Sequence, residues 1–240
     1  MIYIGTSGWA YPHWRNGVFY PEDFKDHELK YYQNFFNSVE LNTSFYHLPK
    51  KKTFENWHKL VPKDFIFSVK GSRYISHILR LSEPREPLEN LLENASGLRE
   101  KLGPIFFQLP PSLKADPKKL SEFAKLLPKN KRFAFEFRHI SWFDPKIYNI
   151  LKEHNIALIF SDTPQYPYVE ELTADFIYLR LHGHEVLYSS SYNQKQLEEH
   201  AYKIKRWHED KRDVYCYFDN DSHGFAPQNA IELKKILESC

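Results

Sequence analysis

The chain has few of the residues that build structural metal sites and disulfide frameworks. Two cysteines occur among 240 residues, Cys216 within an apolar run and Cys240 at the end of the sequence. Two cysteines placed in this way match neither the ligand spacing of a zinc site nor a disulfide framework. They favour a reducing, intracellular setting.

The short motifs that identify several large enzyme classes are also missing. The sequence has eight glycines, and it contains no GxGxxG, P-loop, GxSxG or HExxH pattern. It therefore gives no support for dinucleotide binding, nucleotide-triphosphate hydrolysis or the common serine and zinc hydrolyses. The run 219–224 resembles the start of a calcium loop, but Ala230 stands where such a loop needs glutamate, so a turn after a strand is the better interpretation.

Neither strong net charge nor a long apolar run is present. The 33 lysines and arginines exceed the 31 aspartates and glutamates by two, which argues against the broad positive field of proteins that coat nucleic acid. No stretch approaches the roughly 20 apolar residues of a membrane span, and the first residues, MIYIGTSGW, lack the features of a signal peptide. We expect a cytoplasmic protein with no membrane segment, in which any anion site is local.

What the sequence does contain is a series of short apolar runs, each followed by a helical pattern. Such runs read as buried strands of a parallel sheet. The eight predicted strands are Ile2–Gly5, Ser38–Leu41, Phe65–Val69, Ile105–Leu109, Arg132–Phe137, Ala157–Ser161, Phe176–Leu181 and Val214–Phe218.

Three of the intervening helices have clear start signals. Asp116 and Asp144 each precede a proline, and Asn193 precedes a helical pattern, so all three residues are predicted N-caps. Apolar residues at helical spacing predict further helices in three places: Leu29 to Phe36, Phe54 to Val61, and Leu88 to Leu102. A last helix carries Ala230, Leu233 and Leu237.

Eight alternations of strand and helix without a linker predict one domain over residues 1–240, with the α/β fold of a single (β/α)8 barrel. Pro164 and Pro167 leave little room for a helix between the sixth and seventh strands, so we expect the sixth helix to be reduced. A doubly wound open sheet is the alternative.

Polar residues occupy one face of several predicted strands. Because successive side chains alternate across a strand, Glu136 and Arg138 lie opposite Phe133, Phe135 and Phe137. The same alternation places further polar residues opposite the apolar faces of their strands: Glu40, Asn42, Lys70, Gln108, Arg180 and His182. The sixth strand ends in the carboxylate of Asp162. In a barrel these side chains converge at the C-terminal mouth, where such folds build their sites. Ion pairs that only hold the top of the barrel together, such as Glu136 with Arg138 or Asp162 with Arg180, are the structural alternative.

Aromatic residues, 17% of the chain, are frequent in the segments after these strands. They include Trp9, Tyr11, Trp14, Phe45, Tyr46, Tyr74, Trp142, Tyr188, Tyr192, His223 and Phe225. Rings beside lysine and arginine suit a ligand that has a base or sugar and an anionic group, since rings stack and guanidinium groups bind phosphate or carboxylate. For any single ring, a role as a lid over the core is the competing interpretation.

The motifs GTSGWAYPHWRNGVFYP, FNSVELNTSFYHLP, FSVKGSRYISH, FFQLPPS, FEFRHISWF, LRLHG and YFDNDSHGFAPQNA together resemble the YecE-like family, a widespread family of unknown function. The resemblance runs from about residue 4 to residue 231. It implies a TIM barrel, and it includes Asn220 among the motif positions. The family is similar in fold to endonuclease IV and sugar-isomerase barrels, which suggests nucleic-acid binding by analogy. This chain lacks the dense His/Glu/Asp set that a trinuclear zinc nuclease needs.

The leading hypothesis is an enzyme that acts on a small or nucleic-acid-derived anionic ligand by acid/base chemistry. In it Lys70, Arg138 and Arg180 hold the anion, Glu136 is the general acid or base, and Asp162 and His182 position or shuttle a proton. The predicted catalytic residues are Lys70, Glu136, Asp162 and His182; the predicted ligand-binding residues are Trp9, Glu40, Asn42, Tyr46, Gln108, Arg138, Trp142, Arg180 and Asn220.

Two other functions stay open. The first is a non-catalytic nucleic-acid or nucleotide binding protein that uses the same cations and rings. The second is a metal-dependent sugar isomerase or epimerase, because His182 and His184, on one strand face, could join Glu136 and Asp162 in a metal set. No particular cofactor and no oligomeric state are indicated.

Overall fold

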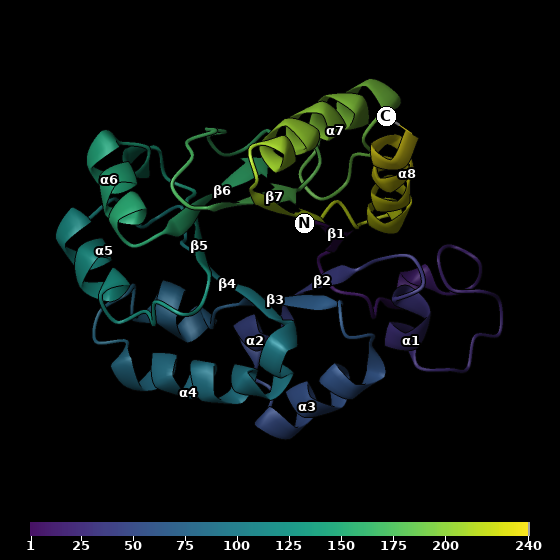
Figure 1. The fold of residues 1–240 in the computed structure, drawn as a ribbon, viewed down its shortest axis with the longest axis horizontal. Coiled ribbons are helices and arrows are strands. Elements are labelled where there is room, and N and C mark those ends of the chain that lie inside the picture. Colours follow the sequence, from purple (N-terminus) through teal and green to yellow (C-terminus); the bar gives the residue numbers. More distant parts are fainter. Residues whose placement is uncertain (240) are drawn as a thin grey trace.

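The computed structural model describes residues 1–239, and its centre is an eight-stranded parallel sheet rolled into a barrel (Figure 1). The strand order is β1-β8-β7-β6-β5-β4-β3-β2. The strands are β1 (Ile2–Thr6), β2 (Ser38–Leu41), β3 (Ile66–Lys70), β4 (Leu102–Gln108), β5 (Phe133–Glu136), β6 (Ile156–Asp162), β7 (Phe176–Leu181) and β8 (Asp213–Phe218). All eight predicted strands are confirmed, and the (β/α)8 barrel replaces the open-sheet alternative.

The seam between β1 and β2 is closed mainly by side chains. The only backbone bridge there among the described residues joins Ser7 to Glu40. Below it, the Asn37 amide donates to the carbonyl of Ile2 and accepts from the backbone N–H of Ile4, at 2.9 and 3.0 Å. A Cβ on Gly5 would lie 2.0 Å from a backbone oxygen of β2, so only glycine permits this approach.

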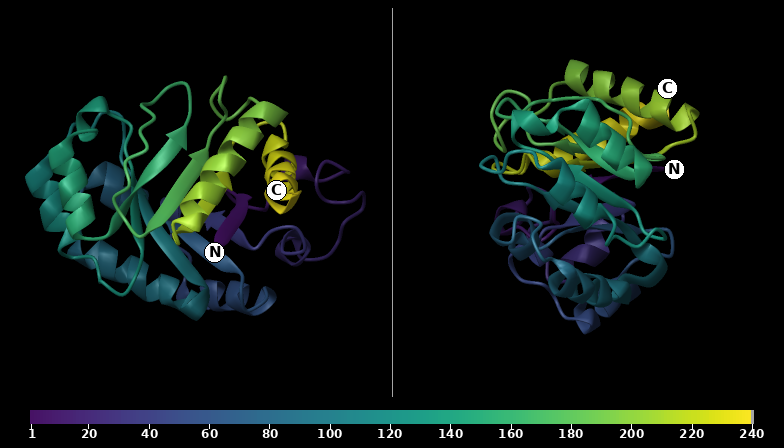
Figure 2. Two further views of the ribbon diagram at one scale, coloured as in Figure 1. Left: turned by 45° about the horizontal axis from the view of Figure 1, so that its top comes forward. Right: turned by 90° about the vertical axis from the view of Figure 1, so that its left-hand side faces the viewer.

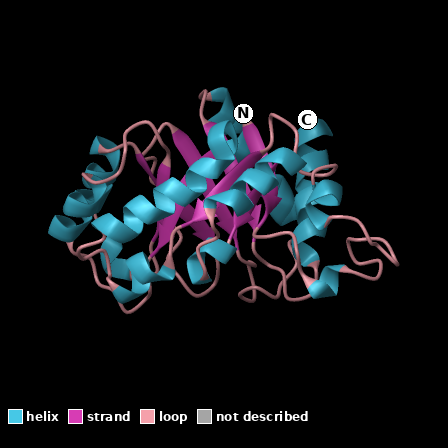
Figure 3. Cartoon of the chain, turned by 90° about the horizontal axis from the view of Figure 1, so that it is seen from below, coloured by secondary structure: helices cyan, strands magenta, loops and turns pink. Residues whose placement is uncertain are grey.

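Helices surround the barrel on its outside (Figures 2 and 3). They are α1 (Glu28–Tyr32), α2 (Thr43–Tyr46), α3 (Lys51–Leu60), α4 (Arg85–Ala95), α5 (Pro117–Ala124), α6 (Pro145–Glu153), α7 (Gln194–Glu209) and α8 (Phe225–Ser239), with short turns of 3-10 or π-helix at Pro12–Trp14, Tyr74–Ile78, Ser96–Lys101 and Ile140–Trp142. Helix α8 packs beside β1, which brings the two ends of the described chain near each other (Figure 1).

The predicted helix starts are confirmed in atomic detail. Asp116, Asp144 and Asn193 each accept a hydrogen bond from a backbone N–H in the first turn of the helix that follows, and the cap at Asn193 is a full capping box. No helix lies between β6 and β7, in agreement with the expected reduction. The helix predicted from Leu88 to Leu102 is too long, because α4 ends at Ala95. A 3-10 segment then returns the chain to the barrel, and Leu102 is the first residue of β4.

Two layers of core lie on either side of the sheet. The side chains that point outward pack against the helices, as Phe133, Phe135 and Phe137 do, and form the large core cluster. The side chains that point inward form a second cluster in the lower barrel: Phe106, Ala134, Ala157, Ile159, Ala174, Phe176, Tyr178, Tyr215 and Tyr217. Above this apolar layer the inward positions become charged, which places the polar residues at the mouth. Within residues 1–239, no helix is long and apolar enough to cross a membrane.

Candidate active site at the barrel mouth

Arg180 on β7 is the centre of a buried ionic network. Its side chain has no exposed surface. Its Nε and Nη2 donate to the two carboxylate oxygens of Glu40 at 2.9 and 2.7 Å, its Nη1 donates to Glu136 at 2.5 Å, and its Nη2 also donates to Asp219 at 2.9 Å. Phe106 lies below the guanidinium, 5.0 Å from its carbon to the ring centre. Every nitrogen of this guanidinium is thus engaged by a carboxylate of the protein.

Glu136 is held as a fixed negative charge. One carboxylate oxygen accepts from Arg180 and the other accepts from Arg138 Nε at 2.8 Å. Burial disfavours its ionised form, but Arg138, Arg180, His182 and Lys70 together keep the pKa of Glu136 well below its usual range. A carboxylate that stays ionised across the physiological range is a poor proton donor.

Lys70 and Arg138 converge on one uncharged oxygen. Lys70 Nζ donates to Gln108 Oε1 at 2.9 Å, and Arg138 Nη2 donates to the same oxygen at 3.0 Å. Lys70 also lies over the ring of Phe45, 4.4 Å from its centre. Burial and the nearby Arg180 lower the pKa of Lys70 to about 8, so a sizeable fraction of this amine is neutral near physiological pH.

Asp219 and His182 complete the mouth beside Arg180. His182 Nδ1 lies 2.9 Å from Asp219 Oδ2, and His182 Nε2 lies 3.7 Å from Glu136. Although burial opposes ionisation, Arg180 and His182 lower the pKa of Asp219 to about 2. Tyr188, from the loop after β7, accepts a hydrogen bond from Arg138 at 3.2 Å and packs edge-on against His182.

A cavity of about 440 Å³ lies above this network. Its wall includes the rings of Tyr46 and Tyr188 and the ionisable groups of Lys70, Asp219 and Asp221. Burial raises the pKa of Asp221 to about 6, although Trp14 and His13 contact its carboxylate. We call this cavity the mouth pocket; its full lining is Tyr11, His13, Asn42, Tyr46, Lys70, Tyr188, Asp219, Asp221 and Ser222.

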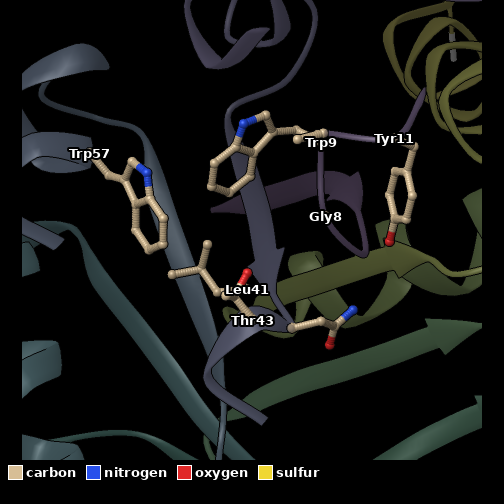
Figure 4. A pocket seen from close by; sticks show the side chains of 8 residues that line it. Gly8, Trp9, Tyr11, Leu41, Thr43 and Trp57 are labelled. Carbon is tan, nitrogen blue, oxygen red and sulfur yellow. The ribbon is translucent and has the colours of Figure 1, made fainter. Parts of the chain in front are cut away.

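A second cavity of about 300 Å³ adjoins the mouth pocket, since Tyr11 and Asn42 line both. Its remaining wall is Gly8, Trp9, Ala10, Leu41, Thr43 and Trp57. Figure 4 shows the two indoles next to each other, with Tyr11 on the other side of Gly8. We call this cavity the tryptophan slot.

Most of the predicted site residues meet at the mouth. Arg180 links Glu40, Glu136 and His182 directly. Lys70 and Arg138 reach the network through Gln108, Asn42 reaches it through Ser7, which donates to Glu40 at 2.6 Å, and Tyr46 only lines the pocket above it. The predicted residues brought together are Glu40, Asn42, Tyr46, Lys70, Gln108, Glu136, Arg138, Arg180 and His182. Arg180 differs from the prediction in that its donors are used within the protein.

Asp162 does not belong to this group. Ala157 and Ile159 on β6 face the barrel interior. Asp162 is an odd number of residues away from both, so strand alternation points its side chain outward, toward the helices. There it contacts His184 Nδ1 at 3.0 Å and His200 Nε2 at 3.2 Å. These residues line a separate cavity of about 380 Å³ beside α7. Of the two ion pairs named by the structural alternative, Asp162 with Arg180 is therefore wrong, whereas Glu136 with Arg138 forms at 2.8 Å.

The proposed metal set is separated in the same way. His182 faces the mouth and His184 faces Asp162, because β7 ends at Leu181 and Gly183, with φ of +103°, turns the chain between them. The interpretation that both imidazoles share one strand face was wrong. In the described part of the chain, residues 1–239, no group of three or more His, Cys, Asp or Glu side chains is placed to hold a metal ion.

Three other predicted ligand-binding residues lie away from the mouth pocket. Trp142 is buried, stacks on Phe137 and donates to the carbonyl of Leu113 at 2.7 Å. Asn220 is buried and donates to Asn229 on α8 and to the Ser190 carbonyl, so it ties the loop after β7 to α8. Trp9 lines the tryptophan slot.

Some residues of the mouth were missed although a signal existed. Asp219 follows Tyr215 and Tyr217 in steps of two, so strand alternation places it on the inward face of β8. Ser7 follows Gly5 in the same way after β1. Asp221 and His13 carried no such signal, because their positions depend on the path of irregular loops, whereas Tyr188 was among the rings expected in the segments after the strands and lines the pocket.

Comparison with known proteins gives one family throughout. The model of the family described as "Protein of unknown function DUF72" matches residues 3–239. Among curated proteins, the chain is 27% identical to UPF0759 protein YunF of Bacillus subtilis over 99% of this chain and 95% of that protein, and 32% identical to UPF0759 protein YecE of Escherichia coli over 60% of this chain and 50% of that protein.

Solved structures agree with this result. A DUF72 family protein from Thermotoga maritima superposes with a TM-score of 0.87 at 32% identity, with 99% of both chains covered. One from Enterococcus faecalis superposes with a TM-score of 0.85 at 22% identity, with 99% of this chain and 96% of that chain covered, and supports the fold. The chain therefore belongs to the DUF72 family, which includes the YecE-like proteins that its motifs resemble.

Proposed function

We propose that the mouth pocket is the active site of an enzyme that binds a small anionic ligand at Lys70, which lines the pocket, with Arg138, which contacts Gln108 and the pocket residue Tyr188, as the second cation. The observation that carries the proposal is the convergence of these two cations on the uncharged Oε1 of Gln108. Glu136 pairs with Arg138 and is shared with Arg180, whereas the contact that Lys70 and Arg138 have in common is a neutral oxygen, so a ligand carboxylate or phosphate at this point would interact with both cations.

In this enzyme Lys70 donates a proton to the bound ligand or accepts one from it. It lines the pocket, and its pKa of about 8 lets it act as an acid or a base near physiological pH. Glu136 serves as a fixed charge that orients Arg138 at 2.8 Å. Arg180 acts through Glu40, Glu136 and Asp219 as a positioning residue. We propose that the chain is a single domain that carries this site.

Binding of inorganic phosphate, pyrophosphate and citrate by the wild type and by the Lys70→Met and Arg138→Leu variants tests the proposal. Loss of a charge-assisted hydrogen bond of about 1.5–3 kcal/mol predicts a roughly 10- to 100-fold weaker affinity by calorimetry. Lys125→Met is the matched control, because Lys125 is exposed at the C-terminal end of α5 and so lies at the opposite end of the barrel from the mouth. A probe that binds all four proteins equally would contradict the assignment.

The salt dependence of binding separates this proposal from the rival nucleic-acid function. One small anion held by two cations gives a shallow decrease of affinity with salt, whereas an oligonucleotide that contacts several phosphate-binding cations gives a steep one. A steep slope for oligonucleotides together with no affinity for small anions would favour the non-catalytic binding protein.

A further inference from the structure

The tryptophan slot differs from the mouth pocket in chemistry. Its lining contains no lysine, arginine, histidine, aspartate or glutamate, and it includes two indoles and Leu41. Trp9 and Trp57 contact each other edge to face, with ring centres 5.4 Å apart and planes at 89° (Figure 4). Such a surface favours a flat, uncharged group over an ion.

The slot and the mouth pocket share a wall that the ionic network holds in place. The Tyr11 hydroxyl donates to the backbone carbonyl of Ser7, and the Asn42 amide donates to Ser7 Oγ. Ser7 Oγ in turn donates to Glu40, the partner of Arg180. Tyr11 and Asn42 are therefore fixed at the boundary between an apolar cavity and a charged one.

Trp57 packs against the core on one side and lines the tryptophan slot on the other. It lies on the outer helix α3, is half-buried, and packs against Phe54 with ring centres 5.4 Å apart. Leucine at this position would preserve an apolar contact with Phe54. The indole adds a large flat surface at the cavity, where Trp9 supplies a second one.

We infer that the ligand of this protein is an aromatic anion, whose ring occupies the tryptophan slot while its phosphate or carboxylate lies at Lys70 and Arg138. The inference rests on the proposed function, because it takes the anion position from it. The cavities, of about 300 and 440 Å³, are each within the range of small-ligand sites. Nucleoside monophosphates and aryl phosphates have the required chemistry.

Calorimetry with matched probes tests the inference. The probes are inorganic phosphate as the anion alone, adenosine and phenol as rings alone, and AMP and phenyl phosphate as the combined ligands. We expect at least one combined ligand to bind the wild type about tenfold more tightly than phosphate, because ring burial adds to the anion contacts. The inference is overturned when both aromatic phosphates bind no more tightly than inorganic phosphate.

Two variants locate the ring. Trp57→Leu retains apolar volume and removes the indole, and Thr43→Trp adds a bulky ring at an exposed position in the wall of the slot. Both should abolish the tenfold gain while phosphate affinity stays unchanged. Tyr202→Leu is the control, because this ring is 69% exposed on α7, outside both cavities. Retention of the gain in both slot variants would overturn the inference.

The two proposals fail in distinguishable ways. If Lys70→Met weakens phosphate binding and the slot variants change nothing, the anion site stands and the aromatic ligand is wrong. If the slot variants weaken adenosine or phenol binding while Lys70→Met leaves the affinity for phosphate and AMP unchanged, the anion position is wrong. The inference of an aromatic anion that occupies both cavities is then wrong as well. Quenching of tryptophan fluorescence on binding of the ring probes, lost in Trp57→Leu, gives a second readout.

Discussion

Arg180 and Glu40 form a two-pronged salt bridge through the inside of the barrel, with hydrogen bonds of 2.9 and 2.7 Å between residues 140 positions apart in the chain. Both side chains are fully buried. Their strands, β7 and β2, are not neighbours in the sheet, so the pair connects elements that share no backbone hydrogen bonds. Because Glu136 and Asp219 also contact Arg180, one cation sets the positions of three carboxylates at the mouth.

Replacing Arg180 with leucine should therefore destabilise the fold. Three carboxylates would lose their buried counter-ion, and breaking a buried pair costs about 3–5 kcal/mol. For a chain of this size that corresponds to a melting temperature lower by roughly 6–20 °C, measurable by calorimetry. Arg85→Leu, which removes an exposed pair with Glu89, should change it little. A stable Arg180→Leu protein that has lost anion binding would mean that Arg180 contacts the ligand directly.

Anion binding should weaken as the pH rises through the pKa of Lys70. In the free protein this pKa is about 8, and the neutral amine formed above it attracts an anion much less. Phosphate affinity measured between pH 7 and 9.5 should fall in the wild type. Because phosphate itself changes charge over part of this interval in both experiments, the comparison is relative: the wild-type affinity should fall with respect to that of a Lys70→Arg variant, whose guanidinium stays charged. The same decrease in both proteins would assign the titration to another group.

Ionisation of Asp221 should lower the free energy of unfolding as the pH rises from mildly acidic to neutral. Burial raises the pKa of Asp221 from 3.8 to about 6, so the folded state binds this proton more tightly than the unfolded state does. The protonated carboxyl therefore stabilises the fold at low pH, and this stabilisation is lost as the pH rises from about 4 through 6. Asp221→Asn stays neutral and keeps an oxygen to accept from Trp14. Urea midpoints measured against pH should show the wild type becoming less stable than the variant by on the order of 1–3 kcal/mol across this interval. A constant difference would rule out the titration of Asp221 as its cause.

Asp162→Asn should affect stability and leave the mouth unchanged. Although burial opposes its ionisation, the contacts with His200 and His184 lower the pKa of Asp162, so its contribution to stability is present at neutral pH and is lost as the pH falls through the lowered pKa. The variant should melt a few degrees lower at pH 7, on the order of 1–2 kcal/mol. Its phosphate affinity should equal that of the wild type. Loss of affinity without loss of stability would restore Asp162 to the active site.

Strand alternation in the sequence predicted the faces of the site residues well. Glu136, Arg138 and Gln108 were assigned to the face opposite the phenylalanines, and the structure places them in one hydrogen-bonded group. On β6 the same alternation, with Ala157 and Ile159 facing inward, places Asp162 outward, against its predicted role. On β8 it places Asp219 inward beside Arg180. These assignments need only the two-residue period of a strand, which is local.

Local sequence signals were enough to predict the eight strands, the helix starts at Asp116, Asp144 and Asn193, and the reduced connection before β7, because caps, prolines and alternation act within a few residues. The folded barrel was needed to show that Arg180 is paired with Glu40, that Lys70 and Arg138 meet at Gln108, and that the tryptophan slot lies beside the mouth pocket. Those contacts join residues far apart in the chain, and their distances depend on how the strands are staggered around the closed barrel.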